Sequence, residues 1–551
     1  MDFSRIRRAS RYLARYREIF TVLVRYGLAD WATRIDLDFI KEIIARKTPK
    51  EFLALSTDER IRRALMELGP TFIKFGQILS VRPDVVGVSL SNELKKLQSN
   101  VDPDAWEDVE KILEKELGKQ VADVFDKLEK EPVASASIGQ VHQGWLKTGE
   151  KVAVKVRHKD IEKIVNTDID ILTDLATLLE KYVEEARLYR PKNTVGQFAR
   201  TIRREMNFDR EARHILNLFE DFADDDTTII PAVYEEYTTS RVLVMEWLEG
   251  VPFNQIPDDA TAGLDKQDLA IKGANLFLKM IFINGYYHAD PHPGNLMVCE
   301  GGKIGLLDFG MMGRLSRKMR EHIEDLAMAA LARDSDRLAK IIIRAGSVSV
   351  DLDETGLGID ITDFISYYGS LPIAKIKLFE ALNELVSIIH RHHIMLPAEI
   401  MMLIKTLVTL EGTGRILSPK FDLLSLLGPY QEQMNLVGFS LTRRMARLNR
   451  FYEEISNFAE TVPPALADII ERFRAGALEI HMEHRGLEHS ANKLVFGIIT
   501  AALFIGSSMI LSFKTPPLVF GYSILGVIGY VVSVLMGLRI LWAIMISGKL
   551  E

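Results

Sequence analysis

The stretch HADPHPGNLMVCEGGKIGLLDFG, residues 288–310, decides the fold of this chain. LMVC at 296–299 predicts a short strand, EGG at 300–302 its turn, and KIGLL at 303–307 the returning strand. A hairpin brings its two ends together. Asn295 just before it and Asp308 just after it are therefore expected side by side, with Asp290 on the entering loop.

Three oxygen-bearing side chains at one point predict a nucleotide and metal site. Hard cations such as Mg²⁺ take oxygen ligands and complete their shell with water and phosphate, so Asn295 and Asp308 are the expected ligands. Asp290 is then free to orient or deprotonate an attacking hydroxyl or water. The spacing HxDxxxxN followed by DFG is that of kinase catalytic machinery. The alternative is a polar hairpin whose Asp residues only cap turns, and His292, between two prolines, is interpreted as structural.

Upstream, KVAVKV at 151–156 alternates like a strand and places Lys155 in the VAVK context of a phosphate-binding lysine. An exposed lysine on an edge strand would explain a lone VAVK equally well. The order along the chain favours the first interpretation. Lys155 precedes Asp290 and Asp308 as in kinases, and VLVMEWLEG at 242–250 lies between them as an expected strand and linker.

The usual phosphate-covering GxGxxG is absent from the sequence before Lys155. PVASASIGQVH at 132–142 stands in its place, and its small Ala and Ser residues would let the backbone approach phosphates. A small-residue turn without a ligand is the alternative.

An amphipathic helix is predicted by ELGPTFIKFGQILSV at 67–81. Lys74 and Gln77 are three residues apart and share a face, while Gly76 lets another backbone come close. From the residues alone, a solvated lysine is the default interpretation of Lys74.

The segment REMNFDREA at 204–212 predicts a polar helix. Its Glu205 and Glu211 are both candidates for the acidic partner of Lys155, and an ordinary charged helix face explains them equally well.

Length and composition bound the class of protein. The 551 residues exceed the ~250–300 residues of one hydrophobic core, so at least two structural units are expected. Hydrophobic residues at 47% and charged residues at 26% are close to globular averages. The net charge of −7 gives no general attraction to nucleic acid, so no nucleic-acid partner is expected. One cysteine, Cys299, excludes an internal disulfide and a Cys-based zinc site.

Apolar residues are concentrated near the C-terminus, where Lys514 is the only charged residue from 494 to 538. KTPP at 514–517 divides this run into 494–513 and 518–538, and each half is long enough to cross a hydrocarbon core of ~30 Å. The run predicts a transmembrane hairpin, with a buried helical hairpin as the alternative. Four basic residues flank it, Arg485, Lys493, Arg539 and Lys549. The positive-inside rule then places both of its ends, and the large N-terminal part, in the cytoplasm.

The first 34 residues hold eight Arg and three acidic residues and predict a basic amphipathic helix. Its interspersed apolar residues include Ile6, Leu13, Phe20 and Leu23. The helix could lie on an anionic membrane surface or be a solvated helix on the domain. Its apolar run at 19–24 is too short for a signal peptide.

Taken together, these motifs resemble the UbiB family of atypical protein-kinase-like proteins. The resemblance covers about residues 60–430, and the C-terminal pair of spans is similar to that of bacterial members. It implies an α+β, protein-kinase-like two-lobed fold with a helical N-terminal extension, a mostly helical C-lobe and a C-terminal transmembrane helical hairpin. It also implies ATP with Mg²⁺ and a role in ubiquinone biosynthesis. The motifs are KFGQ at 74–77, PVASASIGQVH at 132–142, VAVK ending at 155, EMNFDREA at 205–212, HADPHPGN at 288–295 and LDFG at 307–310.

The resemblance implies a role for each candidate residue by its motif position. Lys155 would be the phosphate lysine and Glu205 its ion-pair partner. Asp290 would be the catalytic aspartate, and Asn295 and Asp308 the metal ligands. The Ala-rich nucleotide loop would consist of Val133, Ala134, Ser135, Ala136, Ser137, Ile138, Gly139, Gln140 and Val141.

The same resemblance makes Lys74 and Gln77 regulatory residues of a KxGQ helix that folds over the site where a protein kinase accepts a peptide. That placement disfavours ordinary protein phosphorylation. Two residues depart from the family pattern. Ser135 interrupts the Ala run, and Asn207 stands where many members carry the aspartate of an ExD motif, so its expected hydrogen bond to Lys74 lacks a charge.

Four regions are expected: a helical extension at 1–130 with the KxGQ helix, a kinase-like domain at 131–430, a helical connector at 431–493 and the transmembrane hairpin at 494–546. The implied function is that of an atypical kinase or ATPase at the cytoplasmic face of the bacterial inner membrane, supporting isoprenoid-quinone biosynthesis. Expected partners are membrane lipids and the intermediates or enzymes of that pathway.

Two other functions remain open. HxDxHPGN followed by DFG also resembles aminoglycoside and choline kinases, which suggests a small-molecule phosphotransferase. A nucleotide-gated scaffold without turnover is the other alternative. The KFGQ helix and the hairpin argue against the first. Intact Lys155, Asp290, Asn295 and Asp308 argue against the second.

Overall fold

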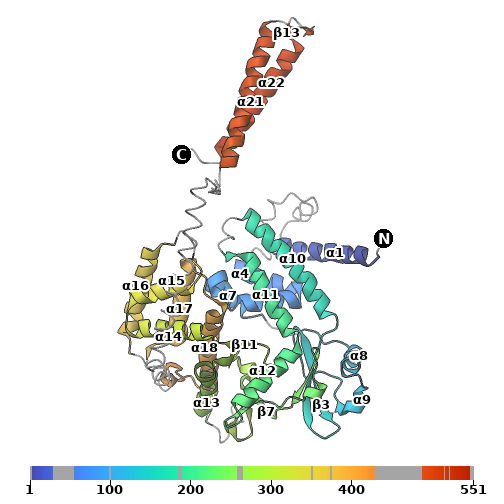
Figure 1. Ribbon diagram of the computed structural model, residues 1–551, viewed down its shortest axis with the longest axis vertical. Helices are drawn as coiled ribbons and strands as arrows, with labels where there is room; N and C mark the ends of the chain where they lie inside the picture. Colours follow the sequence, from blue (N-terminus) through green and yellow to red (C-terminus); the bar gives the residue numbers. More distant parts are fainter. Residues whose placement is uncertain are drawn as a thin grey trace, which may run out of the picture. The chain divides into compact units, whose positions relative to one another are not determined.

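The structure is a computed structural model, shown in Figure 1. It describes residues 3–28, 55–97, 101–183, 186, 189–256, 265–348, 352–372, 375–427, 487–513, 515–519 and 522–546. They belong to two compact units, Met1–Ser440 and Leu441–Glu551, and each is described by itself. Most of the predicted connector at 431–493 lies outside the described residues.

A five-stranded antiparallel sheet forms one lobe of the first unit, in the order β1-β3-β4-β6 with β2 paired to β3. The predicted strand at 151–156 is β4, and Lys155 lies opposite Val141 and Leu243 on the neighbouring strands. The sheet begins within the region 1–130 that was expected to be helical. Its strands are β1 Phe125–Leu128, β2 Ala134–Ser135, β3 Gly139–Leu146, β4 Lys151–Arg157 and β6 Val242–Glu246.

The two faces of this sheet are covered by different helices. Val154 and Val156 of β4 are buried with Val109 and Leu113 of α8 (Trp106–Leu117). Ala153 points the other way, into the core that contains α12 (Phe208–Asp221). Successive strand residues alternate between faces, so Lys155 faces the α12 side.

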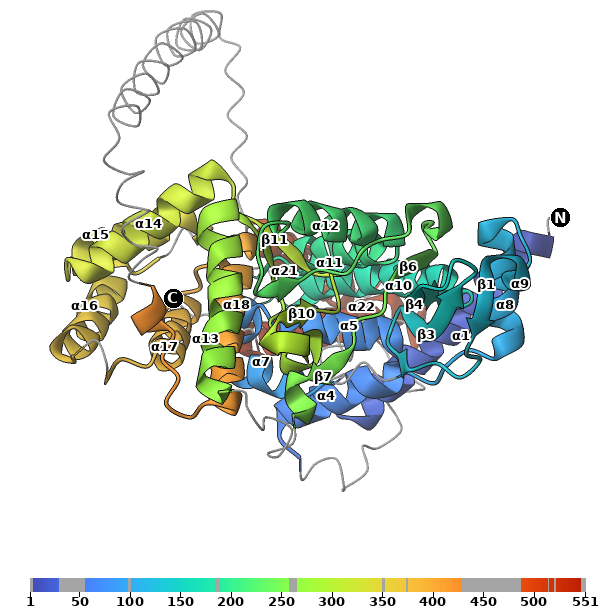
Figure 2. The same cartoon turned by 90° about the horizontal axis from the view of Figure 1, so that it is seen from below.

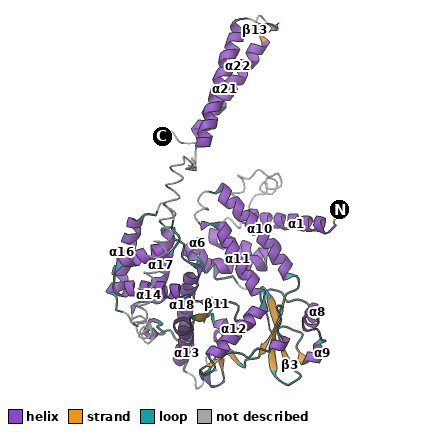
Figure 3. Cartoon of the chain, viewed as in Figure 1, coloured by secondary structure: helices purple, strands orange, loops and turns teal. Residues whose placement is uncertain are grey.

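The second lobe contains the hairpin predicted from the 288–310 segment. β9 (Leu296–Cys299) and β10 (Ile304–Leu306) pair antiparallel, with Leu296 opposite Leu306. They lie in a four-stranded sheet of order β5-β10-β9-β7, and β8 pairs with β11 beside it. The other strands are β5 Thr228–Ile229, β7 Gly250–Pro252, β8 Tyr286–His288 and β11 Met312–Arg314. In Figure 3 the strands of this unit lie together with helices around them.

Two long helices pack together at the centre of this lobe, α13 (Lys266–Leu278) and α18 (Ala398–Leu417). Figure 2 shows them between the strands and a further group of helices with its own apolar core. That group comprises α14 Arg317–Leu331, α15 Ser335–Ala345, α16 Glu354–Ser370 and α17 Leu378–Arg391. A π-helical segment, η5 (Lys279–Asn284), continues α13. Short 3₁₀ turns are η3 Glu235–Tyr237, η4 Phe253–Gln255, η6 Pro293–Asn295, η7 Glu300–Gly302 and η9 Leu424–Leu426.

Of the helices that precede the first sheet in sequence, α5 (Pro70–Leu79) packs on two later ones, α10 (Ile161–Tyr182) and α11 (Pro191–Glu205), whereas α6 (Pro83–Val86) and α7 (Val88–Leu94) pack on α17. The helix predicted at 67–81 is in fact two, because Gly69 with φ 93° ends α4 and Pro70 begins α5. These earlier helices are α1 Phe3–Arg25, α4 Thr57–Leu68, α5 Pro70–Leu79, α6 Pro83–Val86 and α7 Val88–Leu94, with the short α9 Val121–Val124 after α8.

The basic N-terminal helix α1 belongs to this body. Ile19 and Phe20 are 0% and 1% exposed in the main core, and Arg15 forms an ion pair with the buried Asp168 of α10 at 2.8 Å. A buried charge needs such a partner. The structure therefore favours a helix docked on the domain over one that lies on a membrane surface.

The second unit contains two antiparallel helices, α21 (Leu487–Ser512) and α22 (Ile524–Ile546), joined through the paired segments β12 (Leu518–Val519) and β13 (Tyr522–Ser523). Among the described residues, one helix is long and apolar enough to cross a membrane, at Val495–Ser512. The predicted second span began at residue 518, whereas the helix begins at Ile524, because Leu518–Val519 pairs with Tyr522–Ser523. Its apolar stretch, Ile524–Arg539, is shorter than the first.

Candidate active site

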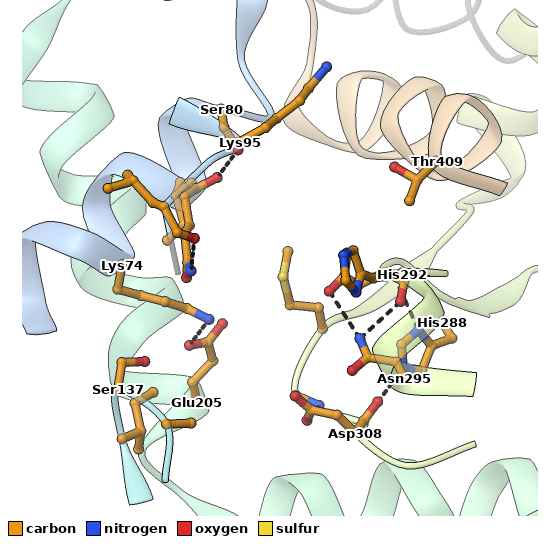
Figure 4. A pocket seen from close by; sticks show the side chains of 18 of the residues that line it. Lys74, Ser80, Lys95, Ser137, Glu205, His288, His292, Asn295, Asp308 and Thr409 are labelled. Carbon is orange, nitrogen blue, oxygen red and sulfur yellow. Dashed lines mark hydrogen bonds and ion pairs between the residues drawn. The ribbon is translucent and has the colours of Figure 1, made fainter. Parts of the chain in front are cut away.

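A cavity of about 900 Å³ in the first unit gathers most of the candidate residues. Figure 4 shows Lys74 and Glu205 on one side and His288, His292, Asn295 and Asp308 on the other. The predicted site residues that line the cavity are Lys74, Gln77, Ala136, Ser137, Ile138, Gly139, Lys155, Glu205, Asp290, Asn295 and Asp308. Five of the nine predicted loop residues do not line it: Val133, Ala134, Ser135, Gln140 and Val141.

Lys155 reaches the cavity from β4 and is held by Glu211 of α12. Its Nζ lies 2.7 and 2.9 Å from the two Glu211 carboxylate oxygens and 3.6 Å from Asp308 Oδ1. Burial would lower the pKa of Lys155, but Asp308 and Glu211 outweigh it and raise that pKa. The lysine is therefore a fixed cation.

Glu205 is not the partner of Lys155, so the pairing implied by the resemblance is wrong. Glu205 forms an ion pair with Lys74 at 2.9 Å instead. The segment 204–212 is not one helix, because α11 ends at Glu205 and Asn207 caps α12 by accepting a hydrogen bond from the Asp209 N–H at 3.1 Å. Because of this break, Glu205 pairs with Lys74 and Glu211 pairs with Lys155.

Asn207 therefore has a local role at the start of α12, and its predicted bond to Lys74 is replaced by the ion pair with Glu205. Burial would lower the pKa of Lys74, yet the Glu205 carboxylate raises it. Lys74 and Gln77 lie on α5 as expected, and Gln77 Nε2 donates to the Leu97 carbonyl at 3.2 Å. The KFGQ helix thus forms one wall of the cavity.

Only the turn of the Ala-rich segment faces the cavity. Ala134 and Ser135 form β2, which pairs with Val141 and Gln140 of β3, so the strands carry the outer residues away from the site. His158 holds the turn between them, with its Nε2 2.9 Å from the Ala136 carbonyl and its backbone N–H donating to the Ile138 carbonyl at 2.9 Å. Small side chains at this turn leave its backbone open to a ligand.

The loop at residues 288–295, here called the catalytic loop, brings Asp290 and Asn295 together. Asn295 Nδ2 donates to Asp290 Oδ2 and to the Asp290 carbonyl, both at 3.1 Å. The Leu307 N–H donates to the Asn295 carbonyl at 3.1 Å, which sets Asn295 beside the residue before Asp308. The predicted juxtaposition across the hairpin is present, while the roles of these residues stay predictions. His292 Nδ1 accepts from the Gly294 N–H at 3.1 Å, as a structural histidine would.

Asp308 has the properties of a metal ligand. Its side chain is 55% exposed to the cavity. Lys155 holds the pKa of this carboxylate well below its usual range, so it is ionised at neutral pH. Among the described residues no group of three His, Cys, Asp or Glu side chains is arranged to hold a metal by itself. The donor set of Asp308 and Asn295 suits Mg²⁺, which keeps water and phosphate oxygens in its shell.

Sequence reasoning missed Lys405 of α18, whose Nζ donates to Asp290 Oδ1 at 3.2 Å. Thr409, one turn further along α18, and Lys95, just after α7, also line the cavity. Lys405 lies 115 residues beyond Asp290 and belongs to no motif. No signal in a single sequence would have pointed to it.

Comparisons with known proteins find family matches in three parts of the chain. Three family models match: the ABC1 atypical kinase-like domain at residues 96–342, the UbiB helical domain at 361–422 and the ABC1/UbiB kinase-like C-terminal domain at 479–546. A Xanthomonas campestris protein named "Probable protein kinase UbiB" is 31% identical over 511 residues, 90% of each chain. An uncharacterized Clostridium pasteurianum protein, from the 5′ region of hydrogenase 1, is 30% identical over 503 residues, 89% of this chain and 94% of that one.

A solved structure, Mycobacterium tuberculosis Rv3197 with erythromycin, matches at 22% identity and a TM-score of 0.39, covering 59% of this chain and 89% of that one. The family match and the elements of the structure confirm the predicted fold class, an α+β kinase-like fold with a helical C-terminal region. Because of these two relatives and the three family matches, the chain belongs to the ABC1/UbiB family of atypical kinase-like proteins.

Proposed function

We propose that this protein binds Mg²⁺ and ATP, hydrolyses ATP or transfers its terminal phosphoryl group, and thereby supports isoprenoid-quinone biosynthesis at the cytoplasmic face of the bacterial inner membrane. One observation carries the proposal: a single cavity is lined by Lys155, Asp290, Asn295 and Asp308. The name of the Xanthomonas campestris relative supports the link to the UbiB group.

Each of these side chains has a task that its geometry supports. Lys155, fixed by Glu211, presents a cation to phosphate oxygens. Asn295 and Asp308 offer oxygens to Mg²⁺, which neutralises developing charge on the phosphoryl group when it is bound. Asp290 orients the attacking hydroxyl or water.

The KFGQ helix disfavours a protein acceptor. α5 lines the same cavity as Asp290 and Asn295, and Lys74 on it is paired with Glu205 inside the cavity. A folded peptide substrate would have to displace this helix. We therefore propose ATP hydrolysis, or phosphoryl transfer to an acceptor other than a peptide.

Mg²⁺-dependent ATP hydrolysis by the purified full-length chain in anionic liposomes tests this proposal. We expect Asp308→Ala to lower the rate about 100-fold or more, since a bound metal ion contributes several kcal/mol of charge stabilisation. Asp336→Ala is the matched control, because Asp336 is an exposed carboxylate on α15 outside the cavity. Turnover in Asp308→Ala equal to that of the control would refute the site assignment.

A scaffold would support quinone synthesis without turnover, whereas the proposed enzyme would need an intact catalytic aspartate. Deleting the gene should lower the respiratory quinone content of extracted lipids. The wild-type gene should restore it, and Asp290→Asn should not, because an amide cannot replace the carboxylate beside the attacking group. Full restoration by Asp290→Asn would favour the scaffold.

A further inference from the structure

Side chains of helix α18 form hydrogen bonds with three successive residues of the catalytic loop. Thr406 Oγ1 donates to the Ala289 carbonyl at 3.2 Å, Lys405 Nζ donates to Asp290 Oδ1 at 3.2 Å, and Thr413 Oγ1 donates to the Pro291 carbonyl at 2.7 Å. Position 413 follows 406 by seven residues and 405 by eight, about two helical turns, so the three side chains lie on one side of the helix. The loop is therefore attached to α18 at residues 289, 290 and 291.

Asp290 is held from both sides by this arrangement. Lys405 occupies Oδ1, and the side-chain amide of Asn295 donates to Oδ2 at 3.1 Å. With a donor on each oxygen, the plane of the carboxylate is fixed before any substrate arrives. Fixing that plane matters because an orienting group must hold the attacking atom in line with the phosphoryl group.

Lys405 is a partly buried cation of the cavity itself. Its side chain is 19% exposed and that of Asp290 is 30% exposed, and both residues line the cavity. Two other lysines there have their own carboxylates, Lys74 with Glu205 and Lys155 with Glu211. Lys74, Lys155 and Lys405 thus each pair with a different carboxylate.

We propose that Lys405 of α18 is a positioning residue of the active centre, which acts through Asp290 by holding its carboxylate in the orientation that the reaction requires. This inference rests on the proposed function. It gives the helical region after the kinase-like domain an indirect part in the chemistry, through Asp290.

A purely structural role for Lys405 predicts different kinetics. If Lys405 only stabilised the fold, its loss would lower the amount of folded protein and affect nucleotide binding along with turnover. A positioning role lowers kcat at nearly constant KM for ATP, because Lys155, Asn295 and Asp308 remain in place.

The test compares Lys405→Met, Lys405→Arg, Asp290→Asn and the double variant Lys405→Met/Asp290→Asn of the full chain in liposomes. We expect Lys405→Met to lower kcat about 10- to 100-fold and to change KM for ATP less than about twofold. Lys405→Arg should restore most of the loss, since a guanidinium also donates to a carboxylate. The double variant should be no slower than Asp290→Asn, because Lys405 has no carboxylate left to position.

Lys272→Met is the matched control. Lys272 also pairs with an aspartate, Asp268 at 2.8 Å, but on the neighbouring helix α13 and outside the cavity. Its variant should keep the wild-type kcat. Equal losses in Lys272→Met and Lys405→Met would show a general effect on stability and overturn the inference.

Failure of the inference and failure of the proposed function give separate results in this assay. If the wild-type chain shows no Mg²⁺-dependent turnover, both the proposed function and the inference are wrong. A wild-type chain that turns over, with Lys405→Met equal to it, overturns the inference alone. A double variant slower than Asp290→Asn by the full Lys405→Met factor also overturns it, because the two residues would then act independently.

Discussion

Lys155 has two carboxylates within reach, and they serve different purposes. Glu211 contacts its Nζ through both oxygens, at 2.7 and 2.9 Å, and fixes the side chain from α12. Asp308 is further away, at 3.6 Å, and faces the cavity. If a metal ion bound Asp308, the two contacts from Glu211 would still hold the lysine.

Replacing this anchor tests which glutamate matters to Lys155. Hydrogen bonds to charged groups contribute about 1.5–3 kcal/mol, so we expect Glu211→Gln to weaken Mg-ATP binding about 10- to 100-fold. Titration with a fluorescent ATP analogue measures the Kd. Glu220→Gln, on the exposed side of the same helix, is the control. An unchanged Kd in Glu211→Gln, with a weakened one in Glu205→Gln, would restore the pairing expected from the motif.

How much of the site can be predicted from the sequence depends on how far apart its residues lie along the chain. Asp290, Asn295 and Asp308 flank one short hairpin, so their meeting follows from local structure alone. Choosing Glu211 over Glu205 required the helix break at Asn207, which a polar pattern without Gly or Pro conceals. Lys405 reaches the site through the packing of α18 on the catalytic loop, which one sequence does not encode in any local pattern.

At the scale of elements, α5 is placed by a close contact at Gly76. A Cβ at this position would collide with Leu97 Cδ1 and lie 2.9 Å from Leu65 Cδ1. The helix with Lys74 can approach α4 and the end of α7 this closely only because residue 76 has no side chain. The sequence suggested such an approach for Gly76, and the structure identifies its partners.

Gly76→Ala should therefore destabilise the protein by about 1–3 kcal/mol, the usual cost of adding a methyl group to a filled core. Denaturant unfolding of the full chain in detergent, followed by tryptophan fluorescence, measures the change. Gly412→Ala is the control on α18, where no atom lies within 4 Å of the added Cβ. There we expect a gain of about 0.5–1 kcal/mol. Equal stability of Gly76→Ala and wild type would contradict the close packing of α5.

Elements were predictable where their residues alternate with a simple period. The strand predicted at 151–156 follows from such a pattern, and the structure extends it to Arg157, whereas the strand at 296–299 was predicted from its apolar run before a glycine turn. The position of α1 could not be predicted from its sequence pattern, because a basic amphipathic helix suits a membrane surface and a protein surface equally well. Asp168 of α10 decides between them by pairing with Arg15, 153 residues away in the chain.

At the scale of the whole molecule, the membrane hairpin remains a proposal that rests on helix length. At 1.5 Å per residue, Val495–Ser512 reaches about 27 Å, close to the thickness of a hydrocarbon core. The apolar stretch Ile524–Arg539 reaches about 24 Å, so a second crossing would require local thinning of the bilayer or use of the rest of α22.

The single cysteine makes the topology testable. Cys299 is buried and burial raises the pKa of its thiol, so it reacts slowly with maleimides. In a Cys299→Ala background, we expect Thr515→Cys, between α21 and α22, to be labelled from outside by an impermeant maleimide in spheroplasts. Thr148→Cys, in an exposed turn of the first unit, should react only after the membrane is opened. Protection of both sites until that step would mean that the hairpin does not cross.

The three hydrogen bonds from α18 to the catalytic loop have a consequence for how such proteins are recognised in genomes. The loop lies within the match to the kinase-like domain at 96–342, whereas Lys405, Thr406 and Thr413 lie within the separate helical match at 361–422. A gene that inherits the first segment without the second would retain the motifs from PVASASIGQVH to LDFG and lose the lysine that contacts Asp290. Activity should therefore be assigned to a relative only when both segments have been inherited together and a cation stands at the position of Lys405.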